Sequence, residues 1–435
     1  MLVKVITFGC KVNQFESQAI MESLKEAGHQ IAGPGDAVDV CIVNTCAVTA
    51  RAAYEARQAI RRVLKAHPNA RIIATGCYAQ TDPWGLMESL EINICIVGND
   101  QKEMLLAPVF SSMNCLEMFV GDIRKKRDIS RFTLKAPQGR TRAYLRIQDG
   151  CNAFCSYCIV PYARGPSRSL PLKQIVEQAE RFRDQGVKEI VVTGIHVGSY
   201  GKDLQKGTRL IDVMDILTAR IKDCRFRLSS IEPQDLTDHF IELAACRKNF
   251  CPHFHIPLQS GSNRILKLMG RRYCAEKFSE CLTALRERLP HAAIGTDCMV
   301  GFPGEEPHDF SKTYRLIQES PLSYLHVFQF SKRPGTKAYG MKETVTKAEK
   351  QRRSQELRQL GLKKKKDFYK MFLGKKLCIL VERVDKRRKI ARGTTANYLH
   401  AVIPLEDGVP GVKANTYATI FAGKYENEHI IGALI

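Results

Sequence analysis

The sequence predicts an α/β protein made of an N-terminal βαβ domain with a parallel sheet, a partial (βα)6 barrel and a small C-terminal β-barrel. In the first two parts, short β-rich runs alternate with amphipathic helical runs, which is the pattern of parallel sheets. The last part shows closely spaced β-rich runs instead, which is typical of a small barrel. With 435 residues and 44% hydrophobic residues, the chain can fill two or three packed cores.

The N-terminal domain is expected to span residues 1–113. Its β-rich and helical runs alternate in the order β, α, β, α, β, at residues 3–10, 15–29, 38–46, 52–67 and 70–77. Asn13 and Glu16 have the spacing of a helix-capping box, with Asn in place of Ser or Thr. We therefore expect Asn13 to cap the first helix.

Three cysteines of this domain each follow a predicted strand. Cys10, Cys46 and Cys77 occur in the similar contexts FGC, NTC and TGC. Because the carboxyl ends of parallel strands share one edge of a sheet, the three thiols are expected to converge there. This pattern favours a metal site, and buried structural thiols are the alternative. Cys41 and Cys95 lie inside apolar strand-like runs, where burial is expected.

A polar linker is expected at residues 114–136, followed by the barrel at residues 137–368. Six β-rich runs predict the barrel strands, at residues 143–150, 188–194, 225–233, 253–261, 292–301 and 324–331. The active site of such a barrel lies at the rim formed by the strand carboxyl ends. Candidate rim residues for binding a cofactor or the substrate are Thr193, Gly194, Ser230, Glu232, Gln259 and Ser260.

The C-terminal part begins with a basic, helix-compatible segment at residues 344–373, which includes four consecutive lysines at 363–366. Further β-rich runs follow at residues 375–384, 389–397, 399–405 and 415–423. We expect residues 369–435 to form the small β-barrel. Such a barrel can present lysine and arginine side chains to RNA phosphates, and a structural cap is the alternative role.

The composition favours a polyanionic partner. The formal net charge is +22 and the isoelectric point is near 9.4. An excess of this size draws a protein to nucleic acid, because each lysine or arginine set against a phosphate releases a counterion. The sequence has no run of about 20 apolar residues and no signal-peptide pattern, so we expect a cytoplasmic protein with no membrane association.

A second group of cysteines forms the most specific motif of the chain. Cys151, Cys155 and Cys158 have CxxxCxxC spacing on one short loop after the first barrel strand. A 4Fe-4S cluster is commonly held by four thiolates, so three local cysteines leave one iron free for another ligand. Zinc and unmetallated thiols are the alternatives, and zinc is disfavoured because the loop lacks a nearby fourth cysteine or histidine.

This loop resembles the radical S-adenosylmethionine motif, because CNAFCSYC places the aromatic Tyr157 just before the last cysteine. The resemblance implies that the open iron binds S-adenosylmethionine and that the reduced cluster cleaves it to give a 5′-deoxyadenosyl radical. Tyr157 is then a candidate cofactor-binding residue. The protein supplies orientation, while the cofactors perform the difficult chemistry.

The whole chain is similar to methylthiotransferases. GCKVNQFES, VNTCAVT, TGCYAQ, HIPLQSGS, TDCMVGFPGE and FSKRPGTKA occur in the order of that family, and the terminal barrel is TRAM-like. The resemblance implies a second 4Fe-4S cluster on Cys10, Cys46 and Cys77, which would act in catalysis with the cluster on the loop. It also implies S-adenosylmethionine as methyl donor and radical source, a sulfur source, and an electron donor such as flavodoxin or ferredoxin.

Three motifs indicate a substrate branch within the family. GCKVNQFES, CIVPYARGPSRS and TGIHVGSYG are most similar to enzymes that modify N6-threonylcarbamoyladenosine in tRNA, at position 37 immediately 3′ of the anticodon. The tRNA anticodon arm is then the expected partner. Methylthiolation of N6-isopentenyladenosine in tRNA or of a ribosomal-protein aspartate is the alternative. A different class of function is a non-catalytic iron-sulfur or zinc protein that binds RNA.

Overall fold

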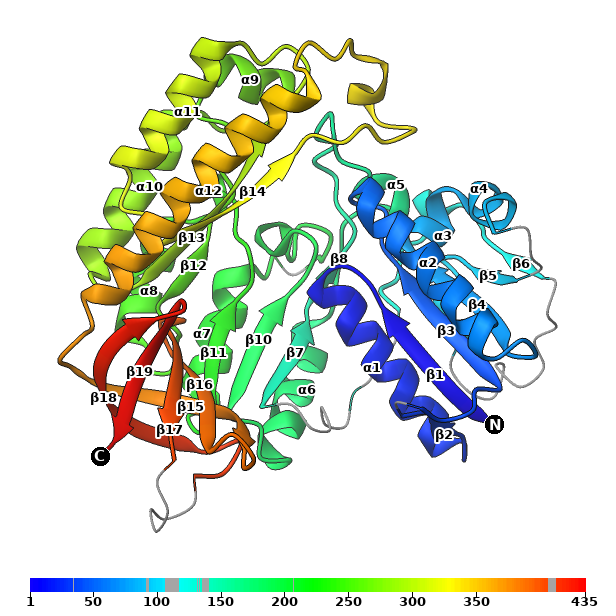
Figure 1. Cartoon of the computed structure of the whole chain (residues 1–435), viewed down its shortest axis with the longest axis horizontal. Coiled ribbons are helices and arrows are strands. Elements are labelled where there is room, and N and C mark those ends of the chain that lie inside the picture. Colours follow the sequence, from blue (N-terminus) through cyan, green and yellow to red (C-terminus); the bar gives the residue numbers. More distant parts are fainter. Residues whose placement is uncertain are drawn as a thin grey trace.

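The computed structural model describes residues 1–33, 35–90, 94–105, 117–130, 132, 134, 141–205, 207–405 and 412–435. Its elements form an N-terminal α/β domain, a six-stranded partial barrel and a C-terminal β-barrel (Figure 1). The predicted α/β fold class is therefore confirmed. The N-terminal domain lies beside the first barrel strand, and the C-terminal barrel lies at the lower end of the central barrel in that view.

The N-terminal domain contains one parallel sheet in the order β2-β1-β3-β4-β5-β6. Its strands are β1 (Leu2–Thr7), β2 (Gln30–Ile31), β3 (Val40–Thr45), β4 (Arg71–Gly76), β5 (Cys95–Val97) and β6 (Met118–Phe119). Its helices are α1 (Lys11–Glu26), α2 (Ala50–Ala66), α3 (Cys77–Thr81), α4 (Pro83–Glu88) and η1 (Lys102–Leu105). Helix α1 covers the face of the sheet that turns toward the barrel, and its apolar side chains join the barrel core.

Helix α1 begins earlier than the capping-box pattern predicts. Cys10 occupies the N-cap position and makes no side-chain cap. The Asn13 amide instead donates to the backbone oxygens of Phe8 and Thr45, at 2.7 and 3.1 Å, and Glu16 is buried. The capping prediction is wrong because both side chains make tertiary contacts, which a local pattern does not reveal.

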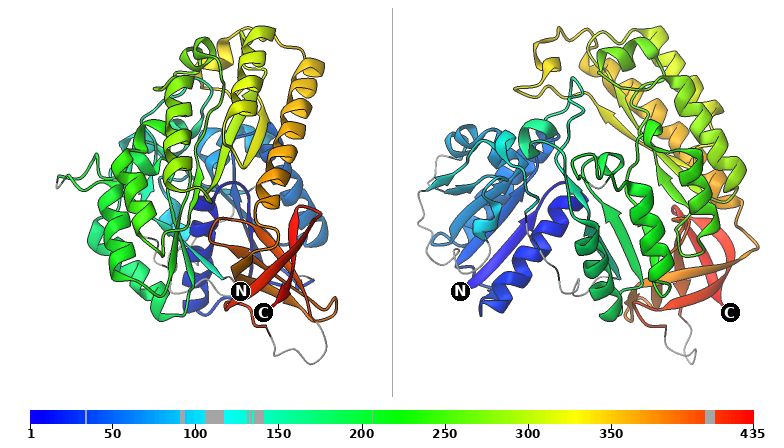
Figure 2. Two further views of the ribbon diagram at one scale, coloured as in Figure 1. Left: turned by 90° about the vertical axis from the view of Figure 1, so that its left-hand side faces the viewer. Right: turned by 180° about the vertical axis from the view of Figure 1, so that it is seen from behind.

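The barrel strands are β7 (Arg142–Arg146), β10 (Glu189–Thr193), β11 (Arg225–Leu228), β12 (His253–His255), β13 (Ala293–Val300) and β14 (Tyr324–Gln329). They form two parallel sheets, β11-β10-β7 and β12-β13-β14. Isolated β-bridges connect the two sheets, from Phe226 to Phe250 and from Ser230 to His255. These are the six predicted strands. Within the described residues β14 and β7 are not paired, so the barrel is open on the side that faces the N-terminal domain (Figures 1 and 2).

Helices cover the outside of the barrel strands. They are α6 (Leu172–Asp184), α7 (Leu210–Arg220), α8 (Asp238–Cys246), α10 (Ala275–Arg288), α11 (Pro307–Glu319) and α12 (Lys347–Lys370). Shorter elements are η3 (Ile123–Lys125), β8 (Gln148–Asp149), α5 (Val160–Arg164), β9 (Arg168–Ser169), η4 (Val197–Ser199), η5 (Pro233–Asp235), α9 (Asn263–Leu268) and η6 (Lys337–Gly340). The rim at the carboxyl ends of the strands is the upper end in Figure 1.

The C-terminal barrel is closed in the order β15-β16-β17-β19-β18. Its strands are β15 (Lys376–Asp385), β16 (Ile390–Thr395), β17 (His400–Pro404), β18 (Tyr417–Glu426) and β19 (His429–Leu434). The first four coincide with the predicted runs, and β19 lies beyond them. Arg225 and Arg227 of the central barrel donate to the backbone oxygens of Thr394 and Ala396, both at 2.9 Å. These contacts hold the C-terminal barrel against the amino ends of the central strands.

Two of the three predicted domain limits cannot be compared with the fold. The limits at 113/114 and 136/137 lie outside the described residues, and the limit at 368/369 falls in the last turn of α12. Across the part of the chain that the structure describes, no helix combines the length and apolar character needed to cross a membrane.

Candidate active site

Cys151, Cys155 and Cys158, the loop triad, lie between β8 and α5 at the barrel rim. Their thiols are free, and the backbone N–H of Cys158 donates to the Cys155 oxygen at 2.9 Å. Phe154 has a left-handed φ of 48°, so the loop turns sharply within the motif. Burial raises the pKa of Cys158 to about 12, and the adjacent Cys155 and Cys151 contribute to the increase. Three clustered thiols can ionise together only when a cation compensates their charge, and this requirement fits an iron-sulfur site.

Arg271, which the sequence analysis did not identify, supports the loop triad. Its Nη1 donates to Cys155 Sγ and to the Tyr157 hydroxyl, both at 3.4 Å, and its Nη2 forms an ion pair with Glu232. A guanidinium beside a thiol favours the thiolate form, which is the form that binds metal. Arg271 thus joins one thiol of the triad to two predicted cofactor-binding residues.

His196 contacts a different thiol of the loop triad. Its Nδ1 is 3.9 Å from Cys151 Sγ, and its Nε2 is 2.9 Å from Asp235 Oδ2. The carboxylate fixes the orientation of the ring, as hydrogen-bond partners of histidines at metal sites do. The only sequence signal for His196 is its place after a barrel strand, in the segment TGIHVGSYG.

The structure brings three of the predicted cofactor-binding residues together near the loop triad. Tyr157 and Glu232 share Arg271, and Gln259 lines the cavity beside the loop with a left-handed φ of 67°. A non-glycine residue held in that conformation is a sign of a site shaped by its surroundings. These three residues are the best placed of the predicted set to contact a bound cofactor.

The other four predicted rim residues have different surroundings. Thr193 is buried at the end of β10, and Gly194 packs so closely on Gln148 that an added Cβ would lie 2.9 Å from its Oε1. Ser230 is exposed. The buried Ser260 hydroxyl lies 3.3 Å from Thr313 Oγ1 of α11, on the outer side of the strands. The structure does not bring the Ser260 hydroxyl to the rim.

Cys10, Cys46 and Cys77, the strand-end triad, follow β1, β3 and β4. Those strands are adjacent and parallel, with Thr7 paired to Asn44 and Thr45 paired to Gly76. Glycines precede two of the cysteines because the backbones approach closely. A Cβ at Gly9 would lie 2.9 Å from Cys46 Cβ, and one at Gly76 would lie 2.4 Å from the Thr45 oxygen. Both glycines also have a left-handed φ, of 97° and 96°.

The strand-end thiols also fit a cluster better than a single ion. Burial raises the pKa of Cys46 to about 12, with added contributions from Cys77 and Cys10. A single ion needs side-chain donor atoms that all lie within about 4.8 Å of one another. Among the described residues, neither thiol triad is that compact. A tetrahedral zinc site needs such short spacing, whereas an iron-sulfur cluster bridges more widely spaced thiolates.

A buried ionic network joins the two triads. Arg164, at the end of α5, donates to Glu16 of α1 at 3.0 Å and to Asp149 at 2.9 Å. Lys102 donates to the same Glu16 carboxylate at 2.6 Å, and Asn13 contacts both Arg164 and Cys10. Burial alone would raise the pKa of Glu16, but Arg164 and Lys102 hold it well below its usual range. The network fixes the loop triad and the strand-end triad relative to each other.

One cavity of about 240 Å³ lies between the loop triad and the residues that follow Cys46. Val48 and Thr49 line it from the N-terminal domain, and the backbone N–H of Val48 lies 3.5 Å from Cys46 Sγ. Cys158 and Tyr157 line it from the loop. The barrel contributes Gln259, Asp297, Met299, Phe328, Gln329, Phe330 and Ser331. A molecule in this cavity can contact both halves of the site.

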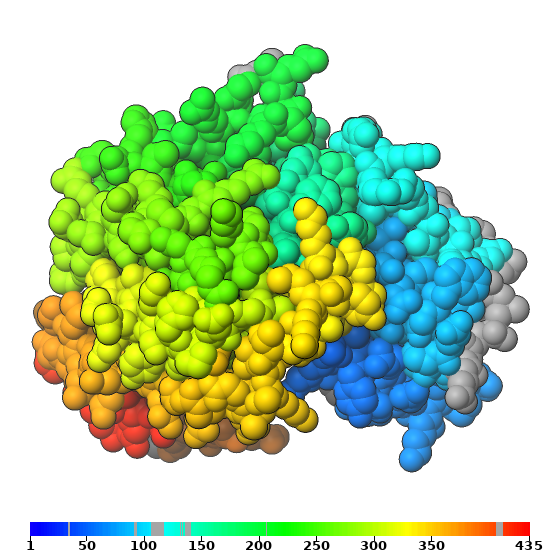
Figure 3. Space-filling model, turned by 90° about the horizontal axis from the view of Figure 1, so that it is seen from above, coloured from blue at the N-terminus to red at the C-terminus, as the bar shows by residue number. Residues whose placement is uncertain are grey.

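The segment that follows β14 covers the junction between the two domains. The backbone N–H of Ala338 donates to the Ser156 oxygen at 2.7 Å, and Arg333 lies within electrostatic reach of Cys46 and Tyr78. In the view from above, this segment (yellow) lies against the N-terminal domain (blue) (Figure 3). It therefore closes the site from above.

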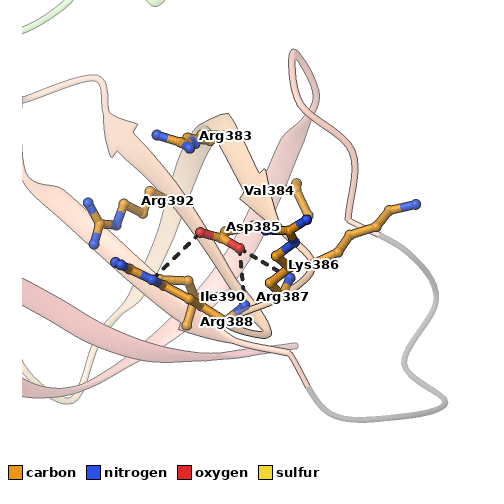
Figure 4. Close-up of a pocket in the computed structure, with 8 residues that line it drawn as sticks. All are labelled: Arg383, Val384, Asp385, Lys386, Arg387, Arg388, Ile390 and Arg392. Carbon is orange, nitrogen blue, oxygen red and sulfur yellow. Dashed lines mark hydrogen bonds and ion pairs between the residues drawn. The ribbon is translucent and has the colours of Figure 1, made fainter.

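A larger hollow of about 660 Å³ lies away from the triads, on the hairpin of β15 and β16 (Figure 4). Its lining residues are Arg383, Val384, Asp385, Lys386, Arg387, Arg388, Ile390 and Arg392. The Asp385 carboxylate accepts the backbone N–H groups of Arg387 and Arg388, at 3.1 and 3.0 Å, which fixes the turn. A surface with several cations and one acid suits phosphate binding rather than catalysis.

Comparisons with known proteins agree with this geometry. A family model described as the radical SAM superfamily matches residues 145–317, and one described as uncharacterized protein family UPF0004 matches residues 2–98. A radical S-adenosylmethionine methyltransferase, TsrM from Kitasatospora setae, has a similar fold, with a TM-score of 0.58 and 14% identity over 78% of this chain and 75% of that chain. The fold and the loop triad therefore define a radical S-adenosylmethionine enzyme, a class that implies a 4Fe-4S cluster and S-adenosylmethionine.

Similar sequences narrow the class. The threonylcarbamoyladenosine tRNA methylthiotransferase MtaB of Bacillus subtilis is 38% identical over 91% of this chain and 89% of that protein. MtaB of Chlamydia pneumoniae is 34% identical over 99% of this chain and 98% of that protein. A tRNA-2-methylthio-N(6)-dimethylallyladenosine synthase of Dictyoglomus thermophilum is 33% identical over 91% of this chain and 90% of that protein. The chain belongs to the radical S-adenosylmethionine methylthiotransferase family, in the MtaB branch.

Proposed function

We propose that this protein converts N6-threonylcarbamoyladenosine at position 37 of tRNA to its 2-methylthio derivative. The proposal rests on one observation: one cavity is lined by Cys158 of the loop triad and by Val48, which contacts Cys46 of the strand-end triad, in a chain that matches MtaB proteins at 34–38% identity over most of its length. Methylthiolation of N6-dimethylallyladenosine is the second candidate, because synthases of that product match at 33%.

The loop triad would hold the 4Fe-4S cluster that binds S-adenosylmethionine, and the strand-end triad would hold a second cluster. When bound, these groups supply a 5′-deoxyadenosyl radical, a methyl group and the site of sulfur transfer. The chain itself orients them. Arg271 keeps Cys155, Tyr157 and Glu232 in place, and the buried network of Glu16 fixes the distance between the triads. The covering segment after β14 limits access of water to the cavity.

The basic surfaces would hold the anticodon arm. The hairpin of β15 and β16 and the lysines of α12 offer contacts to phosphates, so the target base can reach the rim. On this proposal residues 1–113 carry the second cluster, 137–368 the radical centre and 369–435 the RNA contacts. On this proposal the enzyme works on tRNA in the cytoplasm, where it would need a sulfur source and a reductant such as flavodoxin or ferredoxin.

Mass spectrometry of tRNA nucleosides tests the substrate. Deleting the gene should abolish the 2-methylthio derivative of N6-threonylcarbamoyladenosine and leave the unmethylthiolated nucleoside in its place. Expression of the wild-type chain should restore it, and the matched Cys151→Ala variant should not. Loss of the methylthiolated dimethylallyl nucleoside instead would establish the second candidate.

A further inference from the structure

The interior of the central barrel is polar. Alternate residues of a strand face opposite sides, and the outward set, including Ile190, Leu228 and Ile294, packs under the helices. The inward set includes Arg142, Glu189, Arg225, Arg227, His253, His255, Asp297, Tyr324 and His326. Branched apolar side chains usually fill the interior of a βα barrel. Polar and aromatic groups at these positions indicate a chamber for a polar ligand.

The lower half of this chamber carries excess positive charge. The Glu189 carboxylate forms ion pairs with three arginines, Arg142 at 2.9 Å, Arg225 at 2.6 Å and Arg227 at 2.8 Å. Glu382 of the C-terminal barrel pairs with Arg142 as a second acid. Three guanidinium groups therefore face two carboxylates. A ligand that enters this region gains from carrying a negative charge.

Lys11 adds a further cation to the same chamber. It is the first residue of α1, directly after Cys10, and its side chain is half-buried. Arg142, Arg227 and Glu189 lie within electrostatic reach of its ammonium group. Within the described residues no hydrogen bond or ion pair satisfies its ammonium group, so the group is free to bind an anion in the chamber.

His253 provides a second unsatisfied polar group nearby. Its Nε2 lies 2.8 Å from the Tyr324 hydroxyl, but its buried Nδ1 has no hydrogen-bond partner among the described residues. The ring of His253 lies 4.3 Å from that of Tyr398, and the guanidinium of Arg227 lies over Tyr398 at 4.9 Å. Tyr398 has a left-handed φ of 70°, so the C-terminal barrel holds this ring against the chamber.

We infer that Lys11 binds the carboxylate of the threonylcarbamoyl group, and so selects this substrate over an adenosine with an uncharged N6 substituent. The inference rests on the proposed function and adds the residue that reads the substrate. The threonylcarbamoyl group carries a carboxylate and a hydroxyl, whereas the isopentenyl group is a hydrocarbon. A lysine beside a cluster ligand lies where the N6 substituent of an adenine at the two triads can reach it. A free cation there would be left unpaired by the isopentenyl group.

A backbone phosphate of the RNA offers similar chemistry, so the test separates the two anions. Anticodon stem-loops are prepared with N6-threonylcarbamoyladenosine or with its methyl ester, which differ in the side-chain carboxylate and share every phosphate. Dissociation constants are measured with wild type, Lys11→Met, Lys11→Arg and the control Lys25→Met, an exposed lysine near the far end of α1. Product formation and iron content are measured alongside.

Wild type should bind the acid about 100-fold more tightly than the ester, because only the acid forms a charge pair with Lys11. Lys11→Met should lose this preference by weakening only the acid, while Lys11→Arg and Lys25→Met keep it. Equal binding of the acid and the ester by wild type would overturn the inference without any variant. Retention of the preference by Lys11→Met, or equal weakening of both ligands, would also overturn it. Absence of methylthiolated product from wild type, with the preference intact, would instead contradict the proposed function.

Discussion

The two thiol triads are assembled in opposite ways. The loop triad lies within residues 151–158 on a single turn, whereas the strand-end triad collects Cys10, Cys46 and Cys77 from three parallel strands. The first needs only a short loop of the right shape. The second exists only when the sheet has formed in register. One triad is therefore encoded locally, and the other is encoded by the fold.

The supports of the two triads differ in the same way. Arg271 and His196 contact the loop thiols from the barrel rim. The strand-end thiols depend on Gly9 and Gly76 for close backbone approach, and on a buried network centred on Glu16. Damage to the network should therefore affect the strand-end triad first.

Removal of one thiol from each triad should give the largest and the clearest contrast. Cys151→Ala should abolish cleavage of S-adenosylmethionine, because the radical centre loses a ligand. Cys10→Ala should keep that cleavage and lose methylthiolation. Both products, 5′-deoxyadenosine and the methylthiolated nucleoside, are measured by mass spectrometry after anaerobic reconstitution. Cys246→Ala, at an exposed cysteine of α8, should retain both activities. Normal methylthiolation by either triad variant would contradict the roles assigned to the two triads.

Glu16→Gln should destabilise the protein by about 3–5 kcal/mol, because the substitution leaves buried Arg164 and Lys102 without their carboxylate. Denaturant unfolding measures the change. Glu26→Gln, at the exposed end of α1, should change stability by no more than about 0.5–1 kcal/mol. Equal stability of Glu16→Gln and wild type would show that the network does not hold the two domains together.

Arg271→Gln should reduce cleavage of S-adenosylmethionine by about 10–100-fold, as expected for loss of a partner of a metal ligand. Iron at the strand-end triad should be unchanged, because Arg271 contacts only the loop side among the two triads. Arg288→Gln, which removes an exposed ion pair with Glu242, is the matched control. A loss of iron from both centres would mean that the triads are not independently supported.

Acid should produce the smallest change over an accessible pH range. Arg164 and Lys102 hold the pKa of Glu16 below its usual value of about 4.3, although burial opposes them. A carboxyl with a lowered folded-state pKa stabilises the fold above its unfolded pKa and loses that contribution as the pH falls below it. The stability gap between wild type and Glu16→Gln should therefore shrink from pH 6 to pH 3. A constant gap in denaturant unfolding would contradict the ionised state of Glu16.

Much of the fold follows from local patterns. The alternation of β-rich and helical runs predicts the parallel strands, and their order places Cys10, Cys46 and Cys77 at one edge of the sheet. The loop motif predicts the other triad directly. These features depend on spacing along the chain, which a sequence contains.

The supporting contacts depend on tertiary structure and could not be predicted in this way. Asn13 and Glu16 match a capping box, yet the structure uses them to bind Thr45, Arg164 and Lys102. Arg271 lies in no recognisable motif, and only the packing of α9 under the loop brings it to Cys155. Charged side chains that are buried at domain junctions leave no periodic signal.

Iron stoichiometry tests the central claim of two open centres most directly. Anaerobic reconstitution of wild type should give about eight irons per chain, and Cys10→Ala or Cys151→Ala should each give about four. Mössbauer spectroscopy should show 4Fe-4S clusters in all three proteins. A value of about four irons in wild type, unchanged in Cys10→Ala, would contradict a cluster at the strand-end triad.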